Sequence, residues 1–192
     1  HMGTPMRKDF WSNSTVALLG GGSFGTVLAN LLAKNCQSVR MFVRADDQAR
    51  AMNSTRMNPN YFKDLVLDPK ILAFSDYERI FESPIDCLIS ALPSHATRSA
   101  AKEYAKYLRG TELVLHATKG IEEGSLKRMS VVLREELPTL RIGVISGPNL
   151  AAEIARGDPA ATVVASQFDE VILAGEKLLS AAKMRVYGSH DV

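Results

Sequence analysis

Residues 15–34 read TVALLGGGSFGTVLANLLAK: an apolar run, a glycine-rich turn, and then small and apolar residues at helical spacing. Gly20, Gly22 and Gly25 match the pattern GxGxxG, and their place between a predicted strand and a predicted helix makes the match far more specific than the glycines alone. In such a turn the first glycine permits the sharp bend, the second lets a pyrophosphate approach the backbone, and the third lets the helix pack closely on the strand. The phosphates would bind free amides at the positive end of the helix. The stretch predicts a dinucleotide-binding turn, with a ligand-free glycine-rich turn as the alternative.

The rest of the chain alternates short β-branched and leucine-rich runs with longer segments at helical spacing. The runs predict strands at residues 15–19, 39–43, 71–74, 85–91, 112–117, 141–146, 161–165 and 184–187. The longer segments predict helices at residues 25–34, 46–53, 77–81, 94–108, 125–137, 149–156 and 168–182. A less regular stretch, 54–70, predicts a loop beside the sheet. This alternation predicts an α/β fold with a doubly wound, mostly parallel sheet of the Rossmann type.

The composition narrows the class of protein. Of the 192 residues, 46% are hydrophobic and 23% are charged, which is the balance of an ordinary globular domain. The formal net charge is +2 and no Lys/Arg cluster stands out, which argues against nucleic acid as a partner. No apolar stretch approaches the roughly 20 residues of a membrane helix, so no membrane insertion is expected. We interpret residues 1–14 as a tag remnant and N-terminal extension, and residues 15–192 as one domain.

Two cysteines, Cys36 and Cys87, lie far apart and show no CxxC or Cys/His spacing. This pattern argues against a zinc site or a redox pair. It fits a reducing compartment, so we expect a cytoplasmic protein with no bound metal.

Cofactor choice is expected to be decided at the end of the second strand, where an Asp or Glu would hold the ribose 2′-hydroxyl of NAD. Arg44 stands there instead. A guanidinium can pair with the 2′-phosphate of NADP, so NADP is a plausible cofactor. Alternatively, Arg44 is a solvated turn residue and Asp46 or Asp47 serves the ribose, which leaves NAD open.

Ligands of doubly wound sheets bind outside the carboxyl ends of the strands, and the residues just after the strands are therefore candidates. Lys119 could polarise a carbonyl or hold a phosphate, or it could be an ordinary surface lysine. Gly147 could let a substrate or nicotinamide approach the backbone, and Asn149 could cap a helix or contact the ligand. Tyr61, in the irregular loop, could cover an adenine or pin the loop to the core. We expect His116, inside a strand, to be a packed histidine.

Four segments, in this order, resemble the bacterial NAD(P)-dependent glycerol-3-phosphate dehydrogenases. They are GGGSFGT at residues 20–26, NSTRMNPNY at 53–61, ATKGIE at 117–122 and ISGPNLAAEIA at 145–155. The resemblance covers nearly the whole chain from Thr15 to Asp191. It implies reversible hydride transfer between NAD or NADP and the pair dihydroxyacetone phosphate and sn-glycerol 3-phosphate, feeding phospholipid synthesis.

Roles for particular residues also follow from the resemblance. It implies that Ser23, Phe24, Arg44, Lys119 and Ala151 contact the cofactor beside the three motif glycines, with Tyr61 on the adenosine side. It implies that Lys119, Gly147 and Asn149 contact the substrate. Lys119 is the expected catalytic residue within this chain.

The family also has a second, mainly helical domain that carries another catalytic lysine and the substrate-phosphate residues. The resemblance implies that this domain is absent from these 192 residues, that they form a fragment inactive on its own, and that the full-length enzyme is a homodimer. Two alternatives remain open. The chain could come from another two-domain reductase, of the ketopantoate or 3-hydroxyacid type, or it could be a dinucleotide-sensing module without chemistry.

Overall fold

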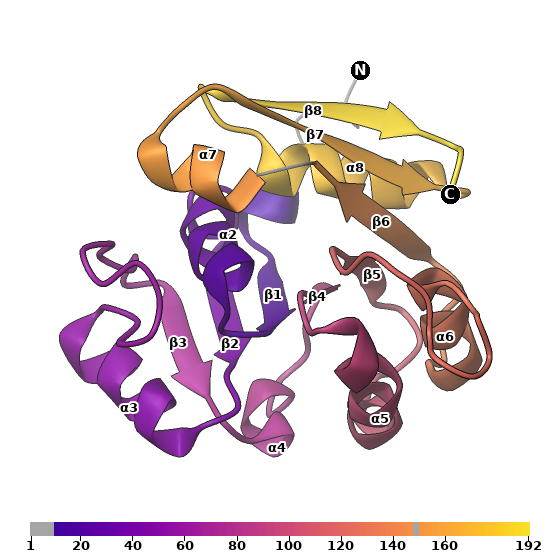
Figure 1. Ribbon diagram of the computed structural model, residues 1–192, viewed down its shortest axis with the longest axis horizontal. Helices are drawn as coiled ribbons and strands as arrows, with labels where there is room; N and C mark the ends of the chain where they lie inside the picture. Colours follow the sequence, from indigo (N-terminus) through magenta and orange to yellow (C-terminus); the bar gives the residue numbers. More distant parts are fainter. Residues whose placement is uncertain (1–9, 148–149) are drawn as a thin grey trace.

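The computed structural model describes residues 10–147 and 150–192. These ranges contain an eight-stranded sheet with helices on both faces (Figure 1). The strands are β1 (Thr15–Leu19), β2 (Ser38–Phe42), β3 (Ile71–Phe74), β4 (Cys87–Ser90), β5 (Leu113–His116), β6 (Ile142–Ser146), β7 (Ala160–Ser166) and β8 (Met184–Ser189). The helices are α2 (Ser23–Ala33), α3 (Asp46–Thr55), α4 (Tyr77–Ile80), α5 (Ser94–Tyr104), α6 (Met129–Glu136), α7 (Leu150–Arg156) and α8 (Asp169–Leu179), with a 3₁₀ turn at Ala105–Tyr107.

The strands lie in the order β3-β2-β1-β4-β5-β6-β7-β8. The first six run parallel, β7 runs antiparallel to β6, and β8 runs parallel to β7. The order 3-2-1-4-5-6 is that of a doubly wound sheet that binds dinucleotides where the direction of winding reverses, between β1 and β4. The predicted fold class is therefore confirmed.

Successive side chains of β1 point alternately into the two hydrophobic clusters on the opposite faces of the sheet. Val16 and Leu18 face the cluster that contains side chains of α2, α3, α7 and α8, whereas Ala17 and Leu19 face the cluster beneath α5 and α6. All four side chains are fully buried. Continuous apolar sequence is what a parallel strand needs when helices cover both of its faces.

The largest difference from the predicted elements precedes α6. We expected a helix from residue 125, but α6 begins at Met129. Gly124 and Leu126 have positive φ values of 88° and 60°, which no helix tolerates, and Ile121 and Arg128 instead form an isolated antiparallel bridge. The expected helix 94–108 likewise ends at Tyr104 and continues only as the 3₁₀ turn.

Two further observations concern the ends of the fold. Trp11 is 7% exposed and belongs to the core cluster, so residues just before β1 contribute to packing. Within the two described ranges, no helix has both the length and the apolar character needed to cross a membrane.

Candidate functional site

The glycine-rich turn connects the carboxyl end of β1 to α2. Gly20 has a φ of +121°, and a Cβ there would lie 2.8 Å from the carbonyl oxygen of Ala91. A Cβ on Gly25 would lie only 2.2 Å from the carbonyl oxygen of Gly20, so the helix approaches the strand as closely as the motif predicts. A Cβ on Gly22 would meet nothing within 4 Å in the part of the chain that the structure describes. The fold itself thus requires glycine at positions 20 and 25, whereas the described residues leave open space beside Gly22.

The N-terminus of α2 faces this open space. Gly22 is its N-cap residue, no side chain from residues 10–147 or 150–192 caps it by a hydrogen bond, and its first turn contains no acidic residue. Uncapped amides at a positive helix end, with no competing carboxylate, suit an anion. This arrangement fits the pyrophosphate of a dinucleotide.

A buried amide cluster holds the turn in place. The Asn58 side chain, 0% exposed, donates to the carbonyl oxygen of Gly21 over 3.0 Å and to the Thr26 hydroxyl over 2.9 Å. Gln48 Nε2 also donates to Gly21, over 3.2 Å. The backbone N–H of Asn60 donates to Asn58 Oδ1 over 3.0 Å. We call Gln48, Asn58 and Thr26 the amide frame.

Sequence reasoning missed the amide frame. Asn58 lies within the segment 53–61 that resembles the family loop, but its partner Gly21 is 37 residues away, and nothing local indicates the contact.

Two adjacent cavities extend along the carboxyl edge of the sheet, on either side of Gly22. One, of about 620 Å³, is lined by Arg44, Gln48, Tyr77 and His95 together with Gly20 and Gly21. The other, of about 680 Å³, is lined by Ser23, Phe24, Gly25, Lys119, Gly147 and Ala151. Gly22, Tyr61, Ala91, Leu92 and Pro93 line both cavities. We call the pair of cavities the crevice.

The crevice thus brings together ten of the eleven residues that the sequence singles out for the site. They come from the glycine turn, the end of β2, the irregular loop, and the segments after β5 and β6. The eleventh, Asn149, lies outside the described residues. Phe62 also lines the crevice, although sequence reasoning did not select it.

Arg44 lies on the side of the crevice near β2, and Tyr61 lines both cavities. Both side chains are exposed, Tyr61 at 42%. Nearby, the Phe42 and Tyr77 rings stack with centroids 4.1 Å apart, and both residues line the same cavity as Arg44. The Arg44 guanidinium has no hydrogen bond or ion pair within the described ranges, and the aromatic rings beside it offer a flat surface. Together they suit a base next to a phosphate or ribose.

Lys119 lies on the opposite side of the crevice. Its side chain is exposed and makes no hydrogen bond or ion pair within the described ranges. The backbone before it is held by His116, whose Nδ1 lies 3.3 Å from the carbonyl oxygen of Thr118, and by the Thr118 hydroxyl, which donates to the carbonyl oxygen of Leu92. A free ammonium on a fixed backbone is suited to bind an incoming carbonyl or phosphate oxygen.

His116 itself is a core residue, as expected. It is 4% exposed, and its Nε2 atom has no hydrogen-bond partner among the described residues. Burial lowers the pKa of His116 to about 4, because charging the ring would remove the imidazolium from water. The imidazole is therefore neutral at pH 7.

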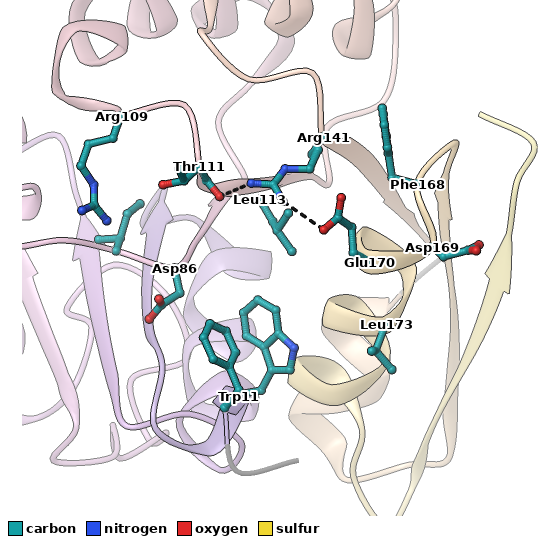
Figure 2. Close-up of a pocket in the computed structure, with 12 residues that line it drawn as sticks. Trp11, Asp86, Arg109, Thr111, Leu113, Arg141, Phe168, Asp169, Glu170 and Leu173 are labelled. Carbon is teal, nitrogen blue, oxygen red and sulfur yellow. Dashed lines mark hydrogen bonds and ion pairs between the residues drawn. The ribbon is translucent and has the colours of Figure 1, made fainter. Parts of the chain in front are cut away.

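Another cavity, of about 970 Å³, lies at the opposite, amino-terminal edge of the sheet (Figure 2). Two of its charged side chains engage each other: Arg141 pairs with Glu170 over 3.0 Å, and it also donates to the carbonyl oxygen of Thr111. Asp86 accepts the backbone N–H of Thr15 over 2.8 Å. Ligands of doubly wound sheets bind at the other edge, so this larger cavity is not our candidate site.

Taken together, the strand order, the glycine turn, the uncapped helix end and the crevice define a dinucleotide-binding domain of the doubly wound class. Residues 15–172 match a family model described as the N-terminus of NAD-dependent glycerol-3-phosphate dehydrogenase. The chain belongs to this family.

Relatives and solved structures agree with this assignment. The chain is 46% identical over 178 residues to the NAD(P)+ glycerol-3-phosphate dehydrogenase of Pseudomonas paraeruginosa, and 40% identical over 188 residues to that of Acinetobacter baumannii. These matches cover 92% and 98% of this chain, but only 51% and 52% of the relatives, so the chain spans about half their length.

The crystal structure of glycerol-3-phosphate dehydrogenase from Coxiella burnetii is similar over 94% of this chain and 55% of its own, with a TM-score of 0.87 and 28% identity. A ketopantoate reductase from Ralstonia eutropha reaches a TM-score of 0.65 at 18% identity, over 93% of this chain and 57% of its own, which shows a shared fold alone.

Proposed function

We propose that this chain is the cofactor-binding part of an NAD(P)-dependent glycerol-3-phosphate dehydrogenase, an oxidoreductase that serves glycerophospholipid synthesis. One observation carries the proposal: residues selected from five separate segments line one crevice at the edge where the winding of the sheet reverses. The family match makes the reaction specific, since a doubly wound domain alone implies only nucleotide binding.

Different residues along the crevice would bind different parts of the dinucleotide. The amides at the start of α2 would hold the pyrophosphate, with Gly22 leaving room for it. Arg44 would face the 2′ position of the adenosine ribose, and Tyr61 would lie against the adenosine. When bound there, the nicotinamide would supply or accept a hydride at the carbon that is the carbonyl of dihydroxyacetone phosphate and the alcohol of sn-glycerol 3-phosphate.

Lys119 would orient the substrate. Its ammonium, free of protein partners among the described residues, would donate to the carbonyl oxygen or the phosphate of the substrate and favour negative charge on that oxygen. Gly147 and Asn149 would bring backbone and amide groups to the same substrate. The second catalytic lysine, which moves the proton, would lie in the longer protein, outside these residues.

The proposal extends to partners and location. The partner is a small phosphate-bearing substrate and neither nucleic acid nor a membrane, the enzyme acts in the cytoplasm, and the longer protein forms a homodimer. The 192 residues alone bind NAD or NADP without measurable turnover, because hydride transfer also needs an oriented carbonyl, a proton donor and a site shielded from water.

Calorimetric titration with NADH and NADPH, paired with an absorbance assay of cofactor oxidation, tests these statements. We expect the chain to bind both cofactors, and Arg44→Ala to weaken NADPH about tenfold more than NADH, since only NADPH presents a phosphate to the guanidinium. We expect the full-length protein to oxidise NADH or NADPH with dihydroxyacetone phosphate and not with ketopantoate. Failure to bind either cofactor, or turnover with ketopantoate alone, would contradict the proposal.

A further inference from the structure

Lys119 begins a loop that has little packing to hold it. Residues 119–128, which we call the Lys119 loop, contain three left-handed residues: Gly120 at a φ of 108°, Gly124 at 88° and Leu126 at 60°. Leu126 is 69% exposed, and every other residue of the loop except Glu122 is exposed as well. The burial of apolar surface therefore cannot fix this segment.

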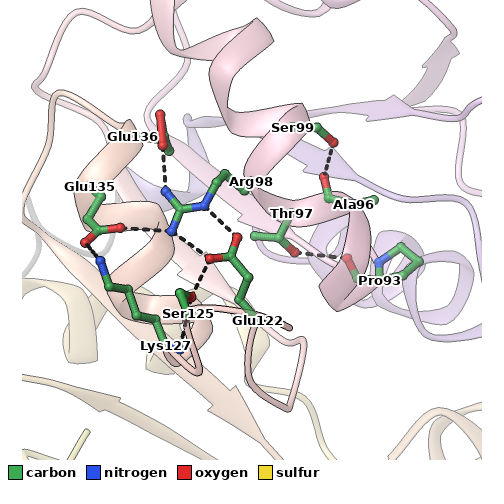
Figure 3. Close-up of polar contacts among 10 residues, drawn as sticks. All are labelled: Pro93, Ala96, Thr97, Arg98, Ser99, Glu122, Ser125, Lys127, Glu135 and Glu136. Atoms are coloured by element: carbon green, nitrogen blue, oxygen red, sulfur yellow. Dashed lines mark hydrogen bonds and ion pairs between the residues drawn. The ribbon is translucent and has the colours of Figure 1, made fainter.

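An ionic cluster centred on Arg98 of α5 holds the loop instead (Figure 3). Arg98 Nε donates to Glu122 Oε2 over 2.5 Å, and Nη2 donates to Glu122 Oε1 over 2.9 Å. This bidentate contact is the strongest and most directional pairing that an arginine makes with a carboxylate. It fixes the position of Glu122, which lies three residues after Lys119.

The same guanidinium reaches α6. Arg98 donates to Glu136 over 2.7 Å and to Glu135 over 2.9 Å, while Lys127 pairs with Glu135. One arginine thus joins the loop to both helices beside it, and the three carboxylates would repel one another without it. In keeping with these contacts, the Arg98 and Ser125 hydrogen bonds lower the pKa of Glu122 to about 2.

The backbone on the other side of Lys119 is also fixed. The contacts of His116 and Thr118 hold the residue before it, and the N-terminal end of α5 lies at Pro93, which lines the crevice. Between these contacts and Glu122, the left-handed Gly120 leaves the backbone free to turn. The Lys119 ammonium has no partner of its own in the described ranges, so its place in the crevice depends on the two flanking attachments.

We propose that Arg98 is a positioning residue: through Glu122 it fixes the Lys119 loop so that the Lys119 ammonium faces the crevice. The inference rests on the proposed function for the identity of the substrate, but the geometry itself concerns this chain alone. Arg98 lines neither cavity of the crevice, so its effect on Lys119 must pass through Glu122.

Kinetics of the full-length enzyme provide the first test. We expect Arg98→Met to raise the KM for dihydroxyacetone phosphate about tenfold while the Kd for NADH, measured by fluorescence, changes less than twofold. In Arg98→Lys the KM should rise less than in Arg98→Met, since lysine keeps the positive charge but cannot make the bidentate contact. The control is Arg134→Met, which removes an exposed arginine of α6 that makes no ion pair in the described ranges. A KM equal to that of the control, or a parallel loss of NADH affinity, would overturn the inference.

A second measurement uses the present chain and does not depend on the substrate. Saturating NADH should slow acetylation of Lys119, followed by mass spectrometry, at least fivefold in the unaltered chain. In Arg98→Met, NADH should still bind but protect Lys119 less than twofold, because the ammonium no longer stays in the crevice. Equal protection in the two chains would overturn the inference even if dihydroxyacetone phosphate proved not to be the substrate. A full-length enzyme without activity on that substrate, with the protection lost in Arg98→Met, would instead reject only the proposed function.

Discussion

The two sides of the crevice are held by different chemistry. On the side of the glycine turn, the amide frame consists of uncharged groups, and its central residue Asn58 is fully buried. On the side of Lys119, the Arg98 cluster consists of charged groups, and the Arg98 side chain is 25% exposed. Buried uncharged hydrogen bonds respond weakly to salt and pH, whereas ion pairs at the surface are screened by salt.

The difference corresponds to what each side is proposed to do. The glycine turn must present backbone amides to a pyrophosphate at a fixed distance, and a rigid, neutral frame suits that purpose. The Lys119 loop presents a flexible side chain to a small substrate. The charged, partly exposed Arg98 cluster is sufficient to hold such a loop in position. We therefore expect perturbations of the first side to affect folding, and perturbations of the second to affect mainly pH dependence and ligand geometry.

The largest effect is expected from Gly25→Ala. The new Cβ would lie 2.2 Å from the Gly20 carbonyl oxygen, and Gly20 cannot yield because it is itself packed against Ala91. We expect a loss of about 3 kcal/mol or more in the free energy of unfolding, measured by chemical denaturation. Ser23→Ala, at an exposed position of the same helix end, is the control and should change stability little. A Gly25→Ala chain as stable as this control would show that the turn is not rigid.

A large pH effect is expected on the other side, at His116. The unfolded histidine titrates near its usual pKa of 6.5, whereas the folded one binds a proton only at about pH 4. Between these values the unfolded state holds more protons, so stability is complete above pH 6.5 and falls as the pH drops toward 4. The loss is about 3 kcal/mol from this residue.

Denaturation of the unaltered chain and of His116→Gln at pH 7 and pH 4.5 measures this loss. Glutamine does not titrate in this range, so most of the difference between the two pH values should disappear. The same fall in stability in both chains would assign it to carboxylates elsewhere.

Much of the fold could be predicted because its signals are local. The predicted bounds of β1 are those observed, since an apolar run ending in glycines specifies both the strand and the turn. The spacing of GxGxxG also predicts the close contact of Gly25 with Gly20. By contrast, the helix predicted from residue 125 was wrong at its start, because helical spacing does not reveal that Leu126 adopts a positive φ.

The two clusters that hold the crevice could not be predicted in the same way. Asn58 meets Gly21 across 37 residues, and Arg98 meets Glu122 across 24. Which polar residue faces which partner depends on how the helices and loops pack around the sheet. The sequence could therefore select the residues that line the crevice from strand ends, and it could not select the residues that hold those segments in place.

A smaller effect is expected from Asn58→Ala, which tests the neutral character of the amide frame. The change leaves the Gly21 carbonyl with one donor fewer and the Asn60 amide without its acceptor, so the free energy of unfolding should fall by about 2 kcal/mol. Because no charge is involved, we expect the same loss at low and at high salt.

Asn60→Ala is the matched control, since it keeps the backbone amide that contacts Asn58 and removes only an exposed side chain. Denaturation at two salt concentrations measures both variants. A loss in Asn58→Ala that shrinks as salt rises, or a control that is equally destabilised, would remove the distinction between the two sides of the crevice.

The smallest effect on stability, and the clearest on binding, is expected from Gly22→Ala. A Cβ at this position meets nothing within 4 Å among the described residues, so the melting temperature should stay close to that of the unaltered chain. The same Cβ would occupy the open space where the pyrophosphate is proposed to approach the start of α2, and NADH affinity should fall about tenfold or more, which corresponds to roughly 1.4 kcal/mol. Calorimetric titration and thermal denaturation of one preparation measure both quantities. Lost affinity with retained stability separates a glycine kept for the ligand from Gly25, which the fold requires. Unchanged NADH affinity would place the pyrophosphate elsewhere, and reduced stability would mean that the space beside Gly22 is needed by the protein itself.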